Sequence, residues 1–172
     1  KRHGLLTEWY EHGYKKYEGT FKNGKQDGLI TNWGDNGGKE KQITYKDGIK
    51  NGLWTEYNHH TDKKIYEGNY KDGLKEGVWT KWMLWASHLI EKEETYEKGE
   101  LIYEKNLEWW EQGDLIYEGF REGPYKDGKK DGTWTYWNEN GQKEWEKIYG
   151  NEDCSESLSR KKTYSYHSNG II

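Results

Sequence analysis

The sequence predicts an all-β protein: an elongated, open, single-layer antiparallel β-sheet built from tandem β-hairpin repeats. A unit of about 24 residues recurs along the chain, and apolar and polar residues alternate with a period of two inside it. Two glycines four residues apart separate the two halves of most units. Because each unit adds strands to the one before, such an array grows as a ribbon and needs no single closed core.

The repeat is clearest in YEGNYKDGLKEGVWTKW, from Tyr66 to Trp82, and returns as YEGTFKNGKQDGLITNW, from Tyr17 to Trp33. One aromatic position recurs at spacings of 24, 25, 26, 29 and 24 residues, at Phe21, Tyr45, Tyr70, Tyr96, Tyr125 and Tyr149. We therefore treat residues 1–172 as one array of about six to seven hairpin units. The expected units are residues 3–16, 17–40, 41–65, 66–91, 92–116, 117–145 and 146–172.

The first half of a unit has the pattern of a half-buried strand, and its two halves are joined by K-[DN]-G-x-x-[DEN]-G. Asn and Asp tolerate the left-handed backbone of a tight hairpin turn, and glycine adopts it freely. We expect turns at the glycine pairs Gly24/Gly28, Gly48/Gly52, Gly73/Gly77 and Gly128/Gly132. The mid-strand glycines would weaken the sheet unless a Trp or Tyr ring covers them, at Gly19, Gly68 and Gly119.

The second half of a unit places an aliphatic residue or threonine, a threonine and an aromatic residue on one face, as in Leu29, Thr31 and Trp33. The aromatic residues of successive units then form a stripe along the sheet. This stripe is either the core of the sheet or a groove that binds a partner, and both interpretations are open. The candidate binding residues are Trp9, Trp33, Tyr57, Trp82, Trp85, Trp109 and Trp137.

The composition supports an aromatic interior and excludes several classes of protein. Hydrophobic residues make up only 31% of the chain, but 11 Trp and 15 Tyr supply large apolar side chains. The 27 basic and 31 acidic residues are mixed, with a formal charge of -4, which does not indicate a nucleic-acid-binding surface. The sequence contains no apolar run long enough for a transmembrane span, and Cys154 is the only cysteine. Without an initiator Met or signal peptide, we expect a processed or partial chain, cytoplasmic or exported after processing.

The repeat pattern breaks at three places. An apolar segment without glycine, residues 83–90, replaces the expected turn after Trp82, and it either caps the sheet locally or protrudes towards a partner. The extra residues 121–124 include the only proline, so we expect a strand edge or a bulge there. Residues 150–160 are polar and are predicted to form a flexible loop.

We expect no enzyme activity, cofactor or metal. Catalysis needs a nucleophile, a base and an orienting group at non-repeating positions, whereas the acids at Glu18 and Glu67 recur with the repeat. Adjacent histidines His59 and His60 would point to opposite faces of a strand, which leaves no chelating pair.

The segments YEGNYKDGLKEGVWTKW and YKDGKKDGTWTYWNENGQK resemble MORN repeats, in the variant of bacterial proteins labelled YwqK-type antitoxins. The resemblance covers most of residues 3–149. It implies an open hairpin array used for protein contacts, for assembly or for lipid head groups, and it does not imply catalysis. The stretch from Gly132 to Gly141 is also similar to choline- and glucan-binding repeats, which lack the preceding half of this unit.

Three functions follow from the pattern. The leading one is a non-catalytic scaffold that binds another protein through the aromatic stripe. The second is a structural protein that assembles with copies of itself, since an open sheet has two unpaired edges. The third is recognition of carbohydrate or of lipid head groups at a membrane surface through the aromatic rings.

Overall fold

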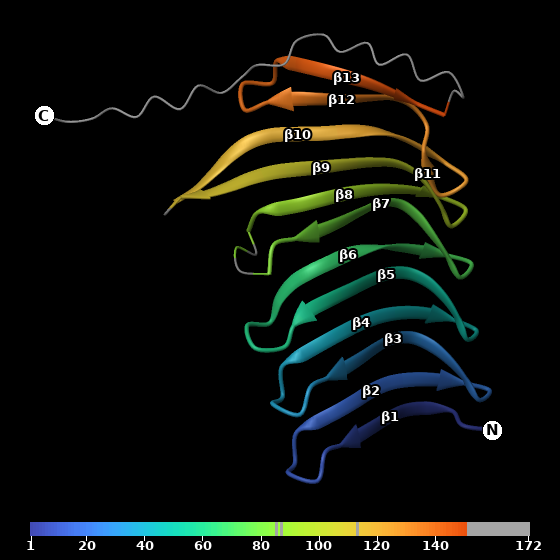
Figure 1. The fold of residues 1–172 in the computed structure, drawn as a ribbon. Coiled ribbons are helices and arrows are strands. Elements are labelled where there is room, and N and C mark those ends of the chain that lie inside the picture. The colour runs from blue at the N-terminus through green and yellow to red at the C-terminus, as the bar shows by residue number, and fades with distance from the viewer. Residues whose placement is uncertain (85, 87, 113, 151–172) are drawn as a thin grey trace, which may run out of the picture.

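The computed structural model describes residues 1–84, 86, 88–112 and 114–150, with the side chains of residues 109–118 left out. These residues form thirteen β-strands, which stack one above another in chain order (Figure 1). The strands are β1 (Gly4–Trp9), β2 (Lys15–Lys22), β3 (Lys25–Trp33), β4 (Lys39–Lys46), β5 (Ile49–Asn58), β6 (Lys63–Lys71), β7 (Leu74–Trp82), β8 (Ile90–Glu97), β9 (Glu100–Gln112), β10 (Asp114–Lys126), β11 (Lys129–Lys130), β12 (Gly132–Asn138) and β13 (Lys143–Tyr149).

All strands belong to one open antiparallel sheet in which the strands pair in chain order, except that β12 pairs with β10 rather than with β11. The short strand β11 pairs with β10 alone, and β1 and β13 lie at opposite ends of the sheet (Figure 1). No helix covers either face in the described part of the chain. The predicted fold, an open single-layer sheet of tandem hairpins, is confirmed. The division into units remains a prediction.

One side of the sheet, the turn edge, is formed by tight two-residue turns. At the turn between β2 and β3, Asn23 and Gly24 have φ angles of 54° and 87°, and the other turns repeat this pair of positive values. Four of these turns are also bonded to the preceding part of the sheet, and in the first of them the N–H of Gly24 donates to the carbonyl of Arg2 at 2.7 Å. The same bond recurs from Gly48 to Gln26, from Gly73 to Lys50 and from Gly99 to Lys75. The predicted turns at the first glycine of each pair are therefore confirmed.

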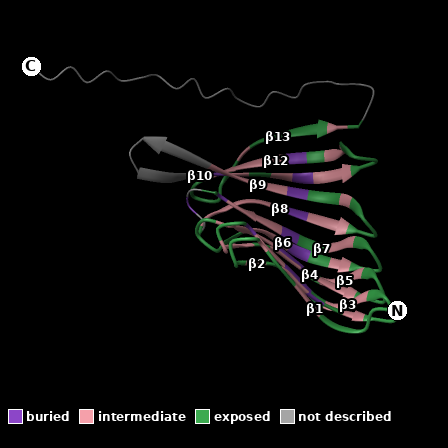
Figure 2. Ribbon diagram, turned by 90° about the horizontal axis from the view of Figure 1, so that it is seen from below, coloured by how far each residue is buried: buried purple, intermediate pink, exposed green. Residues whose placement is uncertain are grey.

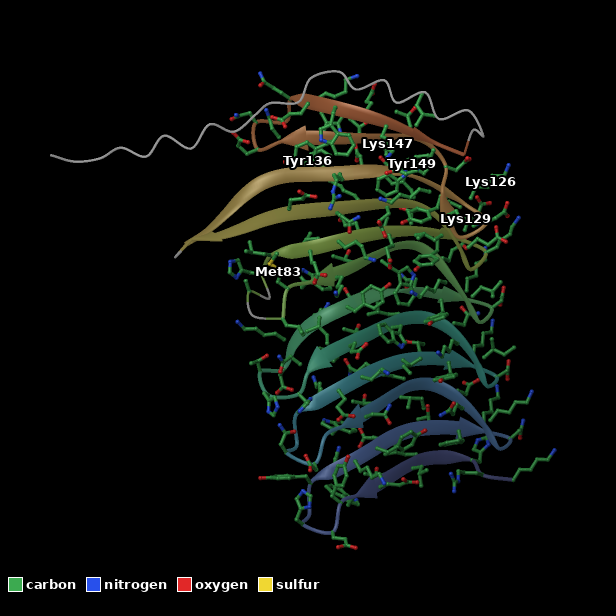
Figure 3. The ribbon with its side chains drawn as sticks, in the orientation of Figure 1. Met83, Lys126, Lys129, Tyr136, Lys147 and Tyr149 are labelled. Carbon is green, nitrogen blue, oxygen red and sulfur yellow. The ribbon has the colours of Figure 1, made fainter. Side chains whose placement is uncertain are left out.

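The opposite side, the loop edge, carries the longer connections. Figure 3 labels Met83 at this edge, and Lys126 and Lys129 at the turn edge. The loops after β1 and β3 are each closed by a backbone bond from the first loop residue to the last, Tyr10 to Tyr14 at 2.8 Å and Gly34 to Gly38 at 2.9 Å. Neighbouring loops are joined as well, which holds successive hairpins in register at this edge.

The two faces of the sheet differ in burial. One face, here the core face, contains all five large buried side chains of the central strands, and buried segments recur near the middle of successive strands (Figure 2). Strand pairing places these residues in one row across the sheet. They are Ile30, Ile43, Trp54, Trp79 and Trp134, with exposures of 2, 8, 8, 0 and 2%. The other face, here the threonine face, contains Thr7, Thr31, Thr55, Thr80 and Thr135 at the centre of its strands.

Glycines on the core face make room for the rings. A Cβ at Gly68 would collide with the ring of Trp79, and one at Gly123 would collide with the ring of Trp134. The expectation that an aromatic ring covers Gly68 is confirmed, and Gly19 lies beneath Ile30 and the ring of Tyr17. For Gly119 it is wrong: that residue abuts backbone atoms of residues 137 and 138, because the added residues shift the position under the ring by four.

The breaks in the repeat are local irregularities. In the apolar segment after β7, Met83 and Ala86 are buried whereas Leu84 is 61% exposed, so the segment covers part of the sheet and also projects one side chain. At Pro124 the ladder between β10 and the following strands is interrupted, as expected where proline removes a donor. The loop predicted at residues 150–160 lies, beyond Gly150, outside the described residues.

Candidate functional site

The predicted aromatic stripe lies on the threonine face, towards the loop edge. Trp9 is 57% exposed, and Trp33 is half-buried. The Lys15 ammonium lies between them, 5.9 Å from the ring centroid of Trp9 and 5.4 Å from that of Trp33. At this end of the stripe a lysine therefore separates the rings through cation–π contacts, whereas Trp137 stacks directly on Phe120, with ring centroids 5.9 Å apart.

The other stripe residues are held by polar neighbours. The Tyr57 hydroxyl donates to Gln42 Oε1 at 2.6 Å, and the Trp137 Nε1–H donates to Glu122 Oε1 at 3.0 Å. Trp82 is half-buried. Trp85 and the side chain of Trp109 lie outside the described residues. The described rings of the stripe are therefore not the core of the sheet, which lies on the opposite face. They are only partly exposed, and they do not line a single continuous groove. That these residues bind a partner remains a prediction.

Beside the stripe, the threonine face presents a row of exposed aliphatic side chains. Leu5, Leu29, Leu53 and Val78 are 67, 52, 46 and 53% exposed. They occupy β1, β3, β5 and β7, and they pair with polar residues on the strands between, Thr20, Thr44, Asn69 and Thr95. This aliphatic row therefore recurs at one position of alternate strands.

A buried group of charges interrupts the apolar row of the core face. Glu94 and Glu104 pair across β8 and β9, and each is 8% exposed. The Lys92 ammonium lies 2.6 Å from Glu94 Oε1 and 3.4 Å from Glu104 Oε2. Tyr66 donates to the other oxygen of Glu94 at 2.6 Å, and Asn106 donates to Glu104 at 2.6 Å. Both buried carboxylates are thus fully supplied with donors, as buried charges require.

Lys75 occupies a cage of three rings beside this group. Its ammonium lies 5.0, 4.3 and 4.4 Å from the ring centroids of Tyr66, Trp79 and Tyr96. It also donates to the two tyrosine hydroxyls, at 3.0 and 3.3 Å. Burial lowers the pKa of Lys75, and burial together with the bond to Glu94 raises the pKa of Tyr66. The chain's own lysine therefore fills the cage.

The protonation state of Glu94 argues for a structural role. Burial alone would raise its pKa, but the bonds from Lys92 and Tyr66 outweigh burial and hold the pKa below its usual value. A general acid at neutral pH needs a raised pKa. The group has the character of a compensated charge network inside an aromatic sheet.

Alignment of the repeats contains the signal for the first of these two acids. In the hairpin of β6 and β7 the central pair is Gly68 and Trp79, and in the hairpin of β8 and β9 the central pair is Glu94 and Glu104. Comparison of the units in sequence therefore detects Glu94, which stands where Gly68 does, but it places Lys105 rather than Glu104 at the position of Trp79, and only the strand pairing brings Glu104 opposite Glu94. Neither Glu94 nor Glu104 was predicted from the sequence, where only the recurring acids such as Glu18 and Glu67 were considered.

A groove of about 530 Å³ lies at the loop edge of β3 to β6. Its polar lining side chains include Lys16, Asn32, Glu40, Lys41 and Glu56. Trp33 and Tyr57 also border it, although their ring contacts are to Lys15 and to Gln42 and Lys39. The remaining lining residues are Tyr10, Asn58, His59, His60, Ile65 and Leu84.

Comparisons with known proteins add no family. No model of a protein family matches the chain, and no curated protein matches it. The resemblance to MORN repeats accordingly remains a prediction from the sequence.

The described residues contain neither a membrane-spanning helix nor a cluster of metal-binding side chains. No helix there has the length and apolarity needed to cross a membrane. Among the same residues, no three His, Cys, Asp or Glu side chains gather in a way that could hold a metal ion.

Proposed function

We propose that this chain is a non-catalytic scaffold that binds another protein through the threonine face of its sheet. The observation that carries the proposal is the row of Leu5, Leu29, Leu53 and Val78, each 46–67% exposed and all on one face. Threonine or asparagine lies between successive members of the row, and exposed apolar side chains gathered on one face and surrounded by polar residues mark interaction sites. At about 4.8 Å per strand, the row extends roughly 29 Å from β1 to β7.

The neighbouring stripe supports the same surface. Half-exposed Trp and Tyr rings beside an aliphatic row are the side chains that contribute most to protein interfaces. Lys15 and Lys64 on this face form ion pairs with Glu18 and Glu67, at 2.6 Å each, so the charges beside the row are largely compensated. The surface therefore fits a partner with an apolar ridge better than a strongly charged one.

A matched pair of variants tests the proposal. The face variant Leu29→Ser, Leu53→Ser, Val78→Ser removes the row. The control variant Ile49→Ser, Leu74→Ser removes aliphatic side chains that are 52 and 50% exposed but lie at the turn edge. Binding partners are captured from an extract of the source cells on immobilised full-length chain and quantified by mass spectrometry, and the affinity of each purified partner is then measured by calorimetry.

We expect the face variant to weaken binding by at least roughly tenfold, because each buried aliphatic side chain contributes about 1.5–3 kcal/mol, while the control variant binds like the parent. Circular dichroism checks that both variants keep the sheet. Equal binding by a folded face variant and the parent would refute the proposal. Light scattering over a concentration series tests the alternative of self-assembly through the unpaired strand edges, which predicts a mass that rises with concentration in the parent and equally in the face variant, whose edge strands are unchanged.

A further inference from the structure

The groove at the loop edge differs from the threonine face in chemistry and in position. It lies on the core face and at the loop edge, where Asn32, Lys41 and Glu56 occupy equivalent positions on successive strands. Its ionic side chains are Lys16, Lys41, Glu40 and Glu56, so their formal charges cancel. A volume of about 530 Å³ falls within the range of roughly 300–1,000 Å³ found for small-molecule sites.

The polar groups of the groove are available to a ligand. Within the described residues, the side chains of Asn32, Glu40 and Glu56 have no hydrogen-bond partner, and Lys16 and Lys41 contact rings rather than carboxylates. The lysines lie 5.6 and 5.5 Å from the ring centroids of Tyr10 and Trp54. Hydrogen-bond donors and acceptors therefore lie side by side in the groove without pairing with one another.

The frame of the groove is fixed by bonds that leave further donors free. The Tyr10 hydroxyl donates to the carbonyl of Trp33 at 2.9 Å, which fixes its ring at the end of the groove. Asn58 Oδ1 accepts from the N–H of His60 at 3.0 Å, so the amide N–H groups of Asn58 remain available. The Asn36 side chain donates to the carbonyl of His59 at 2.8 Å and ties this loop to its neighbour. A site held in this way is preorganised.

We propose that this groove binds a neutral saccharide. Vicinal hydroxyls donate to carboxylates and accept from amides and ammonium groups, and they need no net charge in the site. A phosphate or an anionic head group would need an excess of cations, and the two glutamates oppose it. A peptide would need apolar pockets along its length, whereas the aliphatic lining consists of Ile65 and Leu84.

The test uses the full chain and the double variant Asn32→Ala, Glu56→Ala. The control is Glu8→Ala, because Glu8 occupies the position of Asn32 and Glu56 in the repeat but lies outside the groove. Maltose, cellobiose and chitobiose are titrated with detection by amide chemical shifts in NMR. Inorganic phosphate, vesicles containing phosphatidylserine, and a mixed pool of decapeptides form the other arms.

We expect at least one saccharide to shift the amide signals around Asn32, Asn58 and His59, and the double variant to weaken that binding by roughly tenfold or more. The Glu8→Ala chain should bind like the parent. The inference is overturned if no saccharide shifts these signals, if the double variant binds equally well, or if only phosphate, vesicles or peptides bind at the groove. Partner capture through the threonine face should be unchanged in the double variant, so failure here and failure of the proposed scaffold can be told apart.

Discussion

The assignment of the core face rests on Trp79, and truncation of this side chain is the sharpest test of it. Trp79 is 0% exposed, and its ring centroid lies 5.1–5.4 Å from those of Trp54, Tyr66 and Tyr70. The control for this substitution is a more exposed tryptophan on the threonine face. Trp9, at 57% exposed, is the available match because it has the same side chain on the threonine face.

The magnitude follows from the burial. Full burial of an indole removes roughly 150–250 Å² of surface from water, which at about 25 cal/mol per Å² corresponds to about 4–6 kcal/mol. Substitutions of buried Trp or Phe by Ala lower the free energy of unfolding by about 3–5 kcal/mol, so we expect Trp79→Ala to lower it by about 4 kcal/mol. Trp9→Ala removes less than half of that contact and should lower it by about 1–2 kcal/mol.

The assay has to resolve single hairpins, because repeat arrays can unfold in parts. Urea denaturation followed by circular dichroism gives the free energy of unfolding, and amide hydrogen exchange by mass spectrometry locates the loss. Exchange in Trp79→Ala should accelerate first in β6 to β8, which surround the ring. If Trp9→Ala lowers the free energy of unfolding as much as Trp79→Ala does, the core face has been assigned wrongly.

Three further predictions follow from single contacts. Gly68→Val should lower the free energy of unfolding in urea by about 2–3 kcal/mol, because its side chain would collide with the ring of Trp79, and an unchanged value would contradict that packing. Lys98→Asn should raise the same free energy by about 0.5–1 kcal/mol, since Lys98 has a φ of 49° at a turn position where asparagine is less strained; a lower melting temperature would speak against it. The folded-state pKa of Glu94 lies below its ordinary value of 4.5, so the stabilisation from its carboxylate is present at neutral pH and is lost as the pH falls through the folded-state pKa. Glu94→Gln should therefore have a lower free energy of unfolding at pH 7. In urea denaturation at a series of pH values, that free energy should fall less steeply with acidification in Glu94→Gln than in the parent.

The sequence was sufficient to predict the strands and the turns. The pair Asp47 and Gly48 can take the left-handed backbone in sequence, and their φ angles of 50° and 86° confirm the tight turn. Alternation with a period of two then separates two faces without further information. The composition also predicted that aromatic rings replace an aliphatic interior, which Trp54 and Trp79 bear out.

The choice of the buried face could not be made from alternation alone. Both faces carry tryptophans, as Trp79 and Trp82 show within one strand. The face of Trp79 is the buried one because Gly68 lies opposite it and leaves room for the ring. The pairing of these two residues depends on the register of β6 and β7, which a bulge near Gly68 shifts, so the sequence pattern alone does not give it. The groove was equally hidden, because Lys16 and Glu40 are the extra residues at two equivalent bulges, and simple alternation does not assign such residues to a face.

The closing bond of the loops has a consequence for how this molecule can vary. The connection from Met83 to Leu89 is two residues longer than those after β1 and β3, yet it keeps the same bond from first residue to last, at 3.0 Å. Two added residues are therefore accommodated without loss of the bond that closes the loop. At the turn edge, where Gly24, Gly48, Gly73 and Gly99 donate to the preceding part of the sheet, an insertion would break that series of bonds. New segments, natural or grafted, can be displayed at one margin of the array, one hairpin apart, while the other margin keeps the strands aligned.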